Sequence, residues 1–512
     1  MKISLLAAVP LPTAALLALT AAAAAQSPVE IARDYRSRHG ARVLREYVEL
    51  LKLPNASADT AGIRRNAEAL RERFARRGAS MQLLELPGAA PLVHGVLPAP
   101  GATRTLGIYV HYDGQPVQPA AWSSPPWEPT LCTAAREAGG EPRPLPADGE
   151  LIDPEWRLYA RGSSDDKAPF PALLTALDAL AEAGVERTSN LVFLFEGEEE
   201  IGSPHLEQYM ERFGDALRAD AWLICDGPVH PSRRPQLVFG VRGVVGLELT
   251  VYGAARSLHS GHYGNWAPNP GLRLARLLAS MKDAGGRVTI AGFYDDVEPP
   301  GEAERAALDA LPPVDEALKA ELGLAWTEGG GAPLSERLLL PSLNVRGLAS
   351  AGVGAEAKNV IPSEATASLD IRLVKGCDPE HMLDRIEAHL RKEGYHIVRA
   401  EPTPEERRLH PRLVRVTRGR GYPAARTAMD HPIAQALVAA AERAAGEPVI
   451  RMPSLGGSLP LYLFDEVLGA PVVITPIANH DNNQHAPDEN LRLANLWYGV
   501  DLIAAVLTMP PH

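Results

Sequence analysis

Four short apolar segments of this chain each lead into residues that can bind metal ions. The segments are residues 108–110, 191–195, 222–224 and 472–474, and the residues that follow them are His111, Glu196 to Glu200, Asp226 and His485. Strands buried on both faces of a parallel sheet read as continuous apolar runs. Open α/β sheets hold their ligands beyond the carboxyl ends of the strands. The pattern therefore predicts a metal site at one edge of a mostly parallel sheet.

Taken singly, most of these residues have an alternative interpretation. His111 and Asp113 lie two positions apart, on one side of an extended strand, where the carboxylate can orient a metal-binding imidazole. A histidine satisfied within the core fits the same pattern. Asp165 opens a predicted helix, so it either caps that helix or bridges two cations. Asp226 precedes Gly227 in a common turn pair.

The acidic run from Glu196 to Glu200 is harder to explain without cations. Its carboxylates follow a wholly apolar strand and repel one another unless they are solvated or neutralised by positive charge. In the functional interpretation one glutamate binds metal, and its neighbour acts as general base toward water. A solvated acidic loop is the alternative. His480 competes with His485 as a ligand on chemistry alone. Together the histidines and carboxylates suit zinc, manganese or cobalt.

Length and patterning predict two domains, because 512 residues exceed what one hydrophobic core usually serves. Apolar strands and helices in residues 26–240 predict an α/β catalytic domain with a helix-covered, mostly parallel sheet. From residue 241 the strands alternate apolar and polar residues, which predicts a smaller inserted α+β domain over 241–420. Within it, residues 285–343 are rich in Gly and Pro and read as an extended insertion. The catalytic domain resumes over 421–512 and is therefore discontinuous.

Residues 1–25 have the features of a signal peptide. Lys2 supplies a positive charge, residues 3–25 carry none, and three alanines precede Gln26 as a small-residue cleavage site. We expect export to the periplasm or the medium, with no stable membrane span elsewhere. The net charge of −12 argues against a nucleic-acid partner. Three cysteines are too few and too scattered for a disulfide framework.

A set of short motifs, each unspecific alone, is specific in combination. In order they are His111 to Pro116, Gly162 to Lys167, Glu198 to Ser203, Leu258 to Gly261, Lys358 to Pro362, Gly456 to Ser458, and His485. With them the chain resembles the M20 family of metallopeptidases, which includes carnosinase-like dipeptidases, glutamate carboxypeptidases, aminoacylases and desuccinylases. The resemblance covers essentially the whole chain after residue 25.

The resemblance implies a pair of divalent metal ions, zinc in the first place and manganese or cobalt as alternatives. Asp165 would bridge the two ions. His111 and Asp226 would complete one, and Glu200 and His485 the other. Glu199 would be the general base, Asp113 would orient His111, and the Asp165–Asp166 peptide bond would be cis.

The resemblance also assigns the inserted domain to dimerisation or to a lid, and predicts a homodimer. His259, often reaching the active site of the partner subunit, would stabilise the oxyanion. Four residues would contact the substrate, namely Arg372, Asn359, Gly457 and Ser458. A solvated arginine and a turn histidine are the alternatives for Arg372 and His259. The implied activity is an exopeptidase that cleaves dipeptides or short peptides next to a free carboxylate. An N-acyl-amino-acid deacylase is the alternative.

Overall fold

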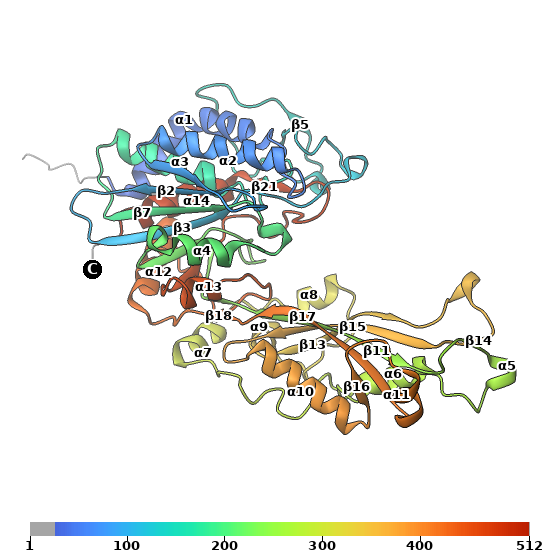
Figure 1. Cartoon of the computed structure of the whole chain (residues 1–512). Coiled ribbons are helices and arrows are strands. Elements are labelled where there is room, and N and C mark those ends of the chain that lie inside the picture. The colour runs from blue at the N-terminus through green and yellow to red at the C-terminus, as the bar shows by residue number, and fades with distance from the viewer. Residues whose placement is uncertain (1–25, 511–512) are drawn as a thin grey trace, which may run out of the picture.

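The computed structural model describes residues 26–510, so the predicted signal peptide, residues 1–25, lies outside the described residues. Two β-sheets with their own helices form two bodies, which lie one above the other in Figure 1. The larger sheet has eight strands in the order β1–β2–β7–β3–β8–β20–β9–β19. Their bounds are Ser80–Leu84 (β1), Leu92–Leu97 (β2), Arg104–His111 (β3), Ser189–Glu196 (β7), Ala221–Ile224 (β8), Gln236–Val238 (β9), Ile450–Met452 (β19) and Val472–Ile474 (β20).

The four apolar runs singled out in the sequence are the four central strands. β7, β3, β8 and β20 are neighbours in that order, and each adjacent pair is parallel. Strands β1 and β2 join the sheet antiparallel, so the whole sheet is mixed. Because the central strands run the same way, their carboxyl ends meet at one edge, which confirms the predicted α/β class.

Both faces of the large sheet are buried, since alternate residues of each strand point to opposite sides. Ile108 and Val110 of β3 pack with one core, and Tyr109 between them packs with the other. The first face is covered by α1 (Pro28–Leu51), α2 (Thr60–Ala75), α3 (Pro169–Glu182), α12 (Pro432–Ala445) and α14 (Leu493–Leu507). The second is covered by α4 (Leu206–Phe213) and α13 (Tyr462–Glu466).

A side sheet closes one flank of the catalytic body. It has the order β21–β6–β4–β5 and includes β4 (Thr130–Cys132), β5 (Pro142–Arg143), β6 (Arg157–Tyr159) and β21 (Asn490–Arg492). β21 pairs with β6, so a C-terminal segment is held beside the loop that leads from β6 into α3. This pairing matters for the site described below.

The smaller body is a five-stranded sheet in the order β13–β15–β11–β17–β16. Its strands are β11 (Gly243–Tyr252), β13 (Ser342–Ala349), β15 (Glu364–Leu373), β16 (His396–Val398) and β17 (Leu413–Tyr422). β15 alternates buried and part-exposed residues along its whole length, as its sequence predicts. The buried face packs on α6 (Pro270–Ala279) and α10 (Pro379–Lys392).

The segment expected to be extended, residues 285–343, contains short helices instead. They are α7 (Glu302–Asp309), α8 (Asp315–Glu321) and α9 (Leu334–Arg337). The start of α7 has a local cause, because the Glu304 side chain accepts a hydrogen bond from the backbone N–H of Gly301. Frequent Gly and Pro keep these helices short without preventing them.

Two short pairings mark where the chain passes between the bodies. β10 (Gly240–Val241) leads out into β11, and β18 (Ala425–Arg426) leads back from β17; the two strands pair with each other. At the far end of the small body, β12 (Leu258–His259), α5 (Ser260–Tyr263) and β14 (Val360–Ile361) form an arm directed away from the large sheet (Figure 1).

Two further observations bear on the sequence predictions. Among the described helices, none has the length and apolar character needed to cross a membrane. Cys132, Cys225 and Cys377 are all buried free thiols.

Candidate metal centre

The carboxyl edge of the parallel strands collects the predicted metal ligands. His111 is the last residue of β3, Asp226 lies two positions after β8, and His485 belongs to the irregular segment after β20. Asp165 comes from the loop between β6 and α3. His111, Asp165 and Asp226 are buried, whereas the His485 side chain is 53% exposed.

These residues form two adjoining clusters. His111, Asp166 and Asp226 form one, and Asp165, Glu200 and His485 the other; in each, one ligand atom per residue lies within 4.8 Å of the others. Asp165 faces both imidazoles, with Oδ1 3.0 Å from Nε2 of His111 and Oδ2 3.0 Å from Nε2 of His485. All five predicted ligands are therefore brought together, and one carboxylate lies between the two clusters.

Asp166 belongs to this constellation although no role was predicted for it. Its Oδ2 accepts a hydrogen bond of 3.3 Å from the backbone N–H of His111. The Asp165–Asp166 peptide bond is cis, as the resemblance implies. The adjacent acids are visible in the sequence, but the pattern does not show which of them faces which cluster. His480, the competing candidate, belongs to neither cluster.

Asp113 holds both the first imidazole and the acidic turn. Its Oδ1 lies 3.4 Å from Nδ1 of His111. The same carboxylate accepts backbone N–H groups of Glu199, at 3.2 Å, and Glu200, at 3.1 Å. This places Oε2 of Glu199 3.9 Å from Nε2 of His111. The buried Asp113 therefore sets the relative positions of a predicted ligand and the predicted base.

Negative charge dominates the electrostatics of the centre. Burial raises the pKa of Glu199 well above its usual range, and the Asp226 and Asp165 carboxylates add to this against the opposing effect of His111. Burial likewise raises the pKa of Asp226 to about 6, with a further contribution from Asp165. Hydrogen bonds to Asp165 and Glu200 raise the pKa of His485 to about 10. The site therefore stabilises a positively charged group placed beside these carboxylates.

The donor set fits divalent metal ions. Imidazole nitrogens and carboxylate oxygens without thiolates are the ligands that zinc, manganese and cobalt accept. Oε1 of Glu200 is buried and accepts no hydrogen bond from the described residues. Buried charged oxygens are rarely left without partners unless they serve a function. Packed carboxylates of this kind favour bound cations, which supports a metal centre.

Glu489, which sequence reasoning missed, supports the loop that presents Asp165. It is fully buried just before β21, and its two oxygens accept five hydrogen bonds from residues 161–165. The Nη1 group of Arg161 donates at 2.7 Å, and the backbone N–H of Asp165 donates at 2.9 Å. Glu489 lies four positions after His485, and nothing in the sequence around it indicates this contact.

The predicted substrate residues fall into two groups. Arg372, at the end of β15, donates from Nη1 to Oγ of Ser458 at 2.8 Å, and the neighbouring Gly457 accepts the backbone N–H of Arg242 at 3.1 Å. These residues meet where the two bodies join. His259 and Asn359 lie on the distant arm, remote from the metal ligands of the same chain (Figure 1).

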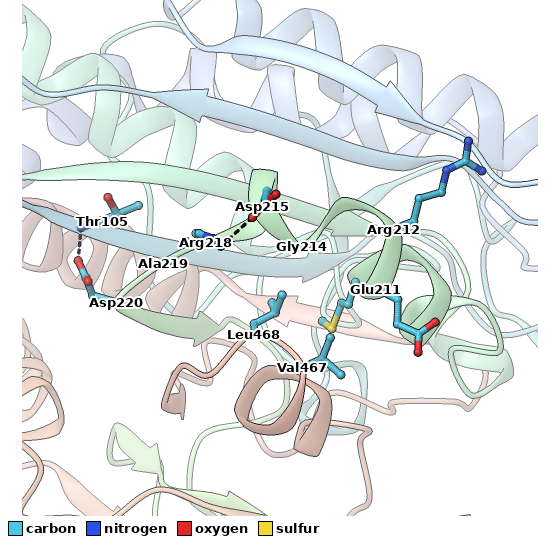
Figure 2. Close-up of a pocket in the computed structure, with 11 residues that line it drawn as sticks. Thr105, Glu211, Arg212, Gly214, Asp215, Arg218, Ala219, Asp220, Val467 and Leu468 are labelled. Atoms are coloured by element: carbon cyan, nitrogen blue, oxygen red, sulfur yellow. Dashed lines mark hydrogen bonds and ion pairs between the residues drawn. The ribbon is translucent and has the colours of Figure 1, made fainter.

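A separate pocket of about 620 Å³ opens at the opposite edge of the sheet (Figure 2). Thr105 and Asp220, at the amino ends of β3 and β8, border it and are joined by a 2.7 Å hydrogen bond from the Thr105 N–H. Arg218 pairs with Asp215 at 2.8 Å on its rim. None of the residues that line it belongs to the metal centre.

The Glu489 contacts lead to a testable prediction. In Glu489→Gln an amide NH₂ replaces one carboxylate oxygen among N–H donors, so the loop carrying Asp165 loses one of its two acceptor oxygens. We expect the free energy of unfolding to fall by about 2–4 kcal/mol and metal affinity to weaken. Urea denaturation and equilibrium dialysis against zinc measure both. The exposed Glu207→Gln on α4 is the matched control, and an unchanged Glu489→Gln protein contradicts the positioning role.

Comparison with known proteins agrees with this geometry. Residues 107–509 match the profile of Peptidase family M20/M25/M40. A Cys-Gly metallodipeptidase of Schizosaccharomyces pombe is 25% identical over 472 residues, covering 88% of this chain and 92% of that protein. The human Beta-Ala-His dipeptidase is 26% identical over 77% of this chain and 78% of its own length.

A solved structure shows the same relationship. The M20 family metallo-carboxypeptidase Sso-CP2 from Sulfolobus solfataricus superposes with a TM-score of 0.74 at 30% identity, covering 92% of this chain and 99% of that one. The profile match spans most of the chain, including every residue of the two ligand clusters. This chain therefore belongs to peptidase family M20/M25/M40 and is a metal-dependent hydrolase.

Proposed function

We propose that this hydrolase is a dipeptidase, which cleaves the amide bond of dipeptides or short peptides next to a free carboxylate. The observation that carries the proposal is the Asp165 carboxylate, which faces His111 and His485 with one oxygen each beside Glu199. The names of the yeast and human relatives, both dipeptidases, favour peptides over N-acyl amino acids as substrates.

We propose that two divalent cations, zinc before manganese or cobalt, are held by these clusters. His111 and Asp226 belong to one cation, Glu200 and His485 to the other, and Asp165 to both. Bound there, such cations supply Lewis acidity toward a carbonyl oxygen and lower the pKa of water. Asp166 lies in the first cluster as well, where its carboxylate contributes negative charge toward the cation.

In this proposal Glu199 carries the proton during hydrolysis. Its carboxylate takes a proton from the attacking water and later delivers it to the leaving amine. A raised pKa suits a group that must both accept and release a proton. Asp113 keeps Glu199 and His111 in position through the contacts described above. Arg372, with Ser458 beside it, binds the free carboxylate of the substrate.

Replacing the proposed base gives a direct test. We expect Glu199→Gln to lower kcat for dipeptides by about 10²- to 10⁴-fold while metal content is retained, because Glu199 belongs to neither cluster. The matched control is Glu198→Gln in the same turn, since Glu198 pairs with His205 at 2.8 Å. We expect the kcat of this control to stay within about threefold of that of the unmodified enzyme.

The assay also separates the two substrate classes. Purified protein is loaded with zinc, its metal content is measured, and a dipeptide panel is compared with acetyl- and succinyl-amino acids. Hydrolysis of the N-acyl amino acids alone would replace the dipeptidase proposal with the deacylase alternative. Full activity of Glu199→Gln would remove Glu199 from the mechanism.

We further propose a homodimer in which each active site receives His259 and Asn359 from the partner subunit. Both residues lie on the arm directed away from the ligands of their own chain (Figure 1). β13 is an edge strand with exposed Val345 and Leu348, and Leu272 of α6 is also exposed. An unpaired, partly apolar edge strand favours pairing with a second copy.

Mixed dimers test this arrangement. His259→Ala and Glu199→Gln should each be nearly inactive alone, because each lacks one group needed at every active site. After unfolding and refolding together in equal amounts, about one quarter of wild-type activity should return, since half of the dimers pair an intact Glu199 with an intact His259. The separately refolded variants are the control. No recovery in refolded mixed dimers would place His259 outside the partner's site.

Export to the periplasm or the medium stays a proposal that rests on the sequence of residues 1–25 alone.

A further inference from the structure

One row of residues crosses the small sheet at the end nearest the catalytic body. In the register of the strands, Val244 of β11 lies opposite Arg372 of β15 on one side and opposite Tyr422 of β17 on the other. Directly opposed residues point to the same face of a sheet. The next residues, Val245 and Ile371, are fully buried against the helices on the other face. Arg372 and Tyr422 therefore share the helix-free face, two strands or roughly 10 Å apart.

This row meets one segment of the catalytic body. Arg372 donates to Ser458, as described above, and the ring of Tyr422 stacks on that of Tyr462 at the start of α13. The two ring centroids are 6.0 Å apart, and the planes differ by 14°. Contacts at both positions fix the row against residues 458–462, which belong to the body that carries the metal ligands.

The surroundings of the Tyr422 phenol place it between two groups of the proposed mechanism. Burial raises the pKa of Tyr422 to about 12; the negative charge of Glu199 adds to this, and the positive charge of Arg372 opposes it. The charges of the proposed base and of the proposed carboxylate anchor both shift the pKa of this phenol, so it lies near both groups.

Within residues 26–510 the hydroxyl of Tyr422 has no hydrogen-bond partner. Only burial and nearby charges shift its pKa. Its oxygen is not fully buried, unlike the unpaired hydroxyls of Tyr252 and Tyr498. The half-buried hydroxyl of Tyr422 therefore remains available to a bound molecule.

We propose that Tyr422 is a substrate-contacting residue whose hydroxyl donates a hydrogen bond to an oxygen of the peptide bound between Arg372 and Glu199. This rests on the proposed function, because it uses the roles assigned there to Arg372 and Glu199. A phenol with a pKa of about 12 stays protonated at physiological pH, so Tyr422 acts as a donor and not as a base. The stacked Tyr462 ring limits its movement and reduces the entropy lost on binding.

The test compares two hydroxyl deletions in the same aromatic stack, using the full-length, zinc-loaded enzyme. Tyr422→Phe should lower kcat/KM for dipeptides by about 10- to 100-fold, the effect of losing a hydrogen bond to a charged or developing anionic oxygen. Tyr462→Phe keeps the stack and lies outside the row, so its kcat/KM should stay within about twofold of that of the unmodified enzyme. A fall in kcat indicates contact with the reacting carbonyl, and a rise in KM indicates contact with the carboxylate.

A second measurement keeps the proposal independent of turnover. Adding a dipeptide to Glu199→Gln protein should give a tyrosine ultraviolet difference spectrum that disappears with Tyr422→Phe and persists with Tyr462→Phe. If the unmodified enzyme cleaves dipeptides but Tyr422→Phe matches it in kcat/KM and in spectrum, this inference alone is wrong. If the unmodified enzyme neither cleaves nor binds dipeptides, the proposed function fails and this inference fails with it.

Discussion

The catalytic centre contains several buried carboxylates and few positively charged groups, and the rest of its structure depends on this imbalance. Asp165 is the extreme case, since each of its oxygens lies 3.0 Å from a different imidazole. Mutual repulsion within this group is relieved by protonation or by bound cations, and a cation is bound well only if the carboxylates cannot move apart. Rigidity and metal affinity are therefore two consequences of the same packing.

That rigidity comes from residues that do not bind metal themselves. Glu489 gathers the N–H groups of the loop before Asp165, and Asp113 does the same for the turn that carries Glu199 and Glu200. Both are fully buried carboxylates that accept backbone N–H groups, which are strong donors to ionised acceptors. The parallel strands bring the ligands to one edge of the sheet, and these two carboxylates set their final positions there.

The sequence predicted what is encoded locally. The apolar strands, their polar ends and the alternating strand of the small sheet all follow from neighbouring residues. This pattern pointed to His111, the acidic run, Asp226 and His485 at one edge of the sheet, and the resemblance to the family selected Asp165 and Glu200. The positions of Asp166 and Glu489 and the proposed role of Tyr422 could not be predicted in this way. They depend on a loop conformation, on the pairing of β21 with β6, and on a cross-strand register, each of which joins segments far apart in the chain.

The proposed site is divided between the two bodies, so the length of substrate that it accepts depends on how far apart the bodies are held. The anchor Arg372 stands on the small sheet, whereas the ligands and Glu199 stand on the large one. The contacts of Arg372 with Ser458 and of Tyr422 with Tyr462 hold the two at a set separation. A peptide whose carboxylate reaches the anchor presents its amide to Glu199 only if the intervening part matches that separation. In the proposed function, selection for short peptides would then follow from the distance between Arg372 and Glu199, without a pocket that reads every side chain.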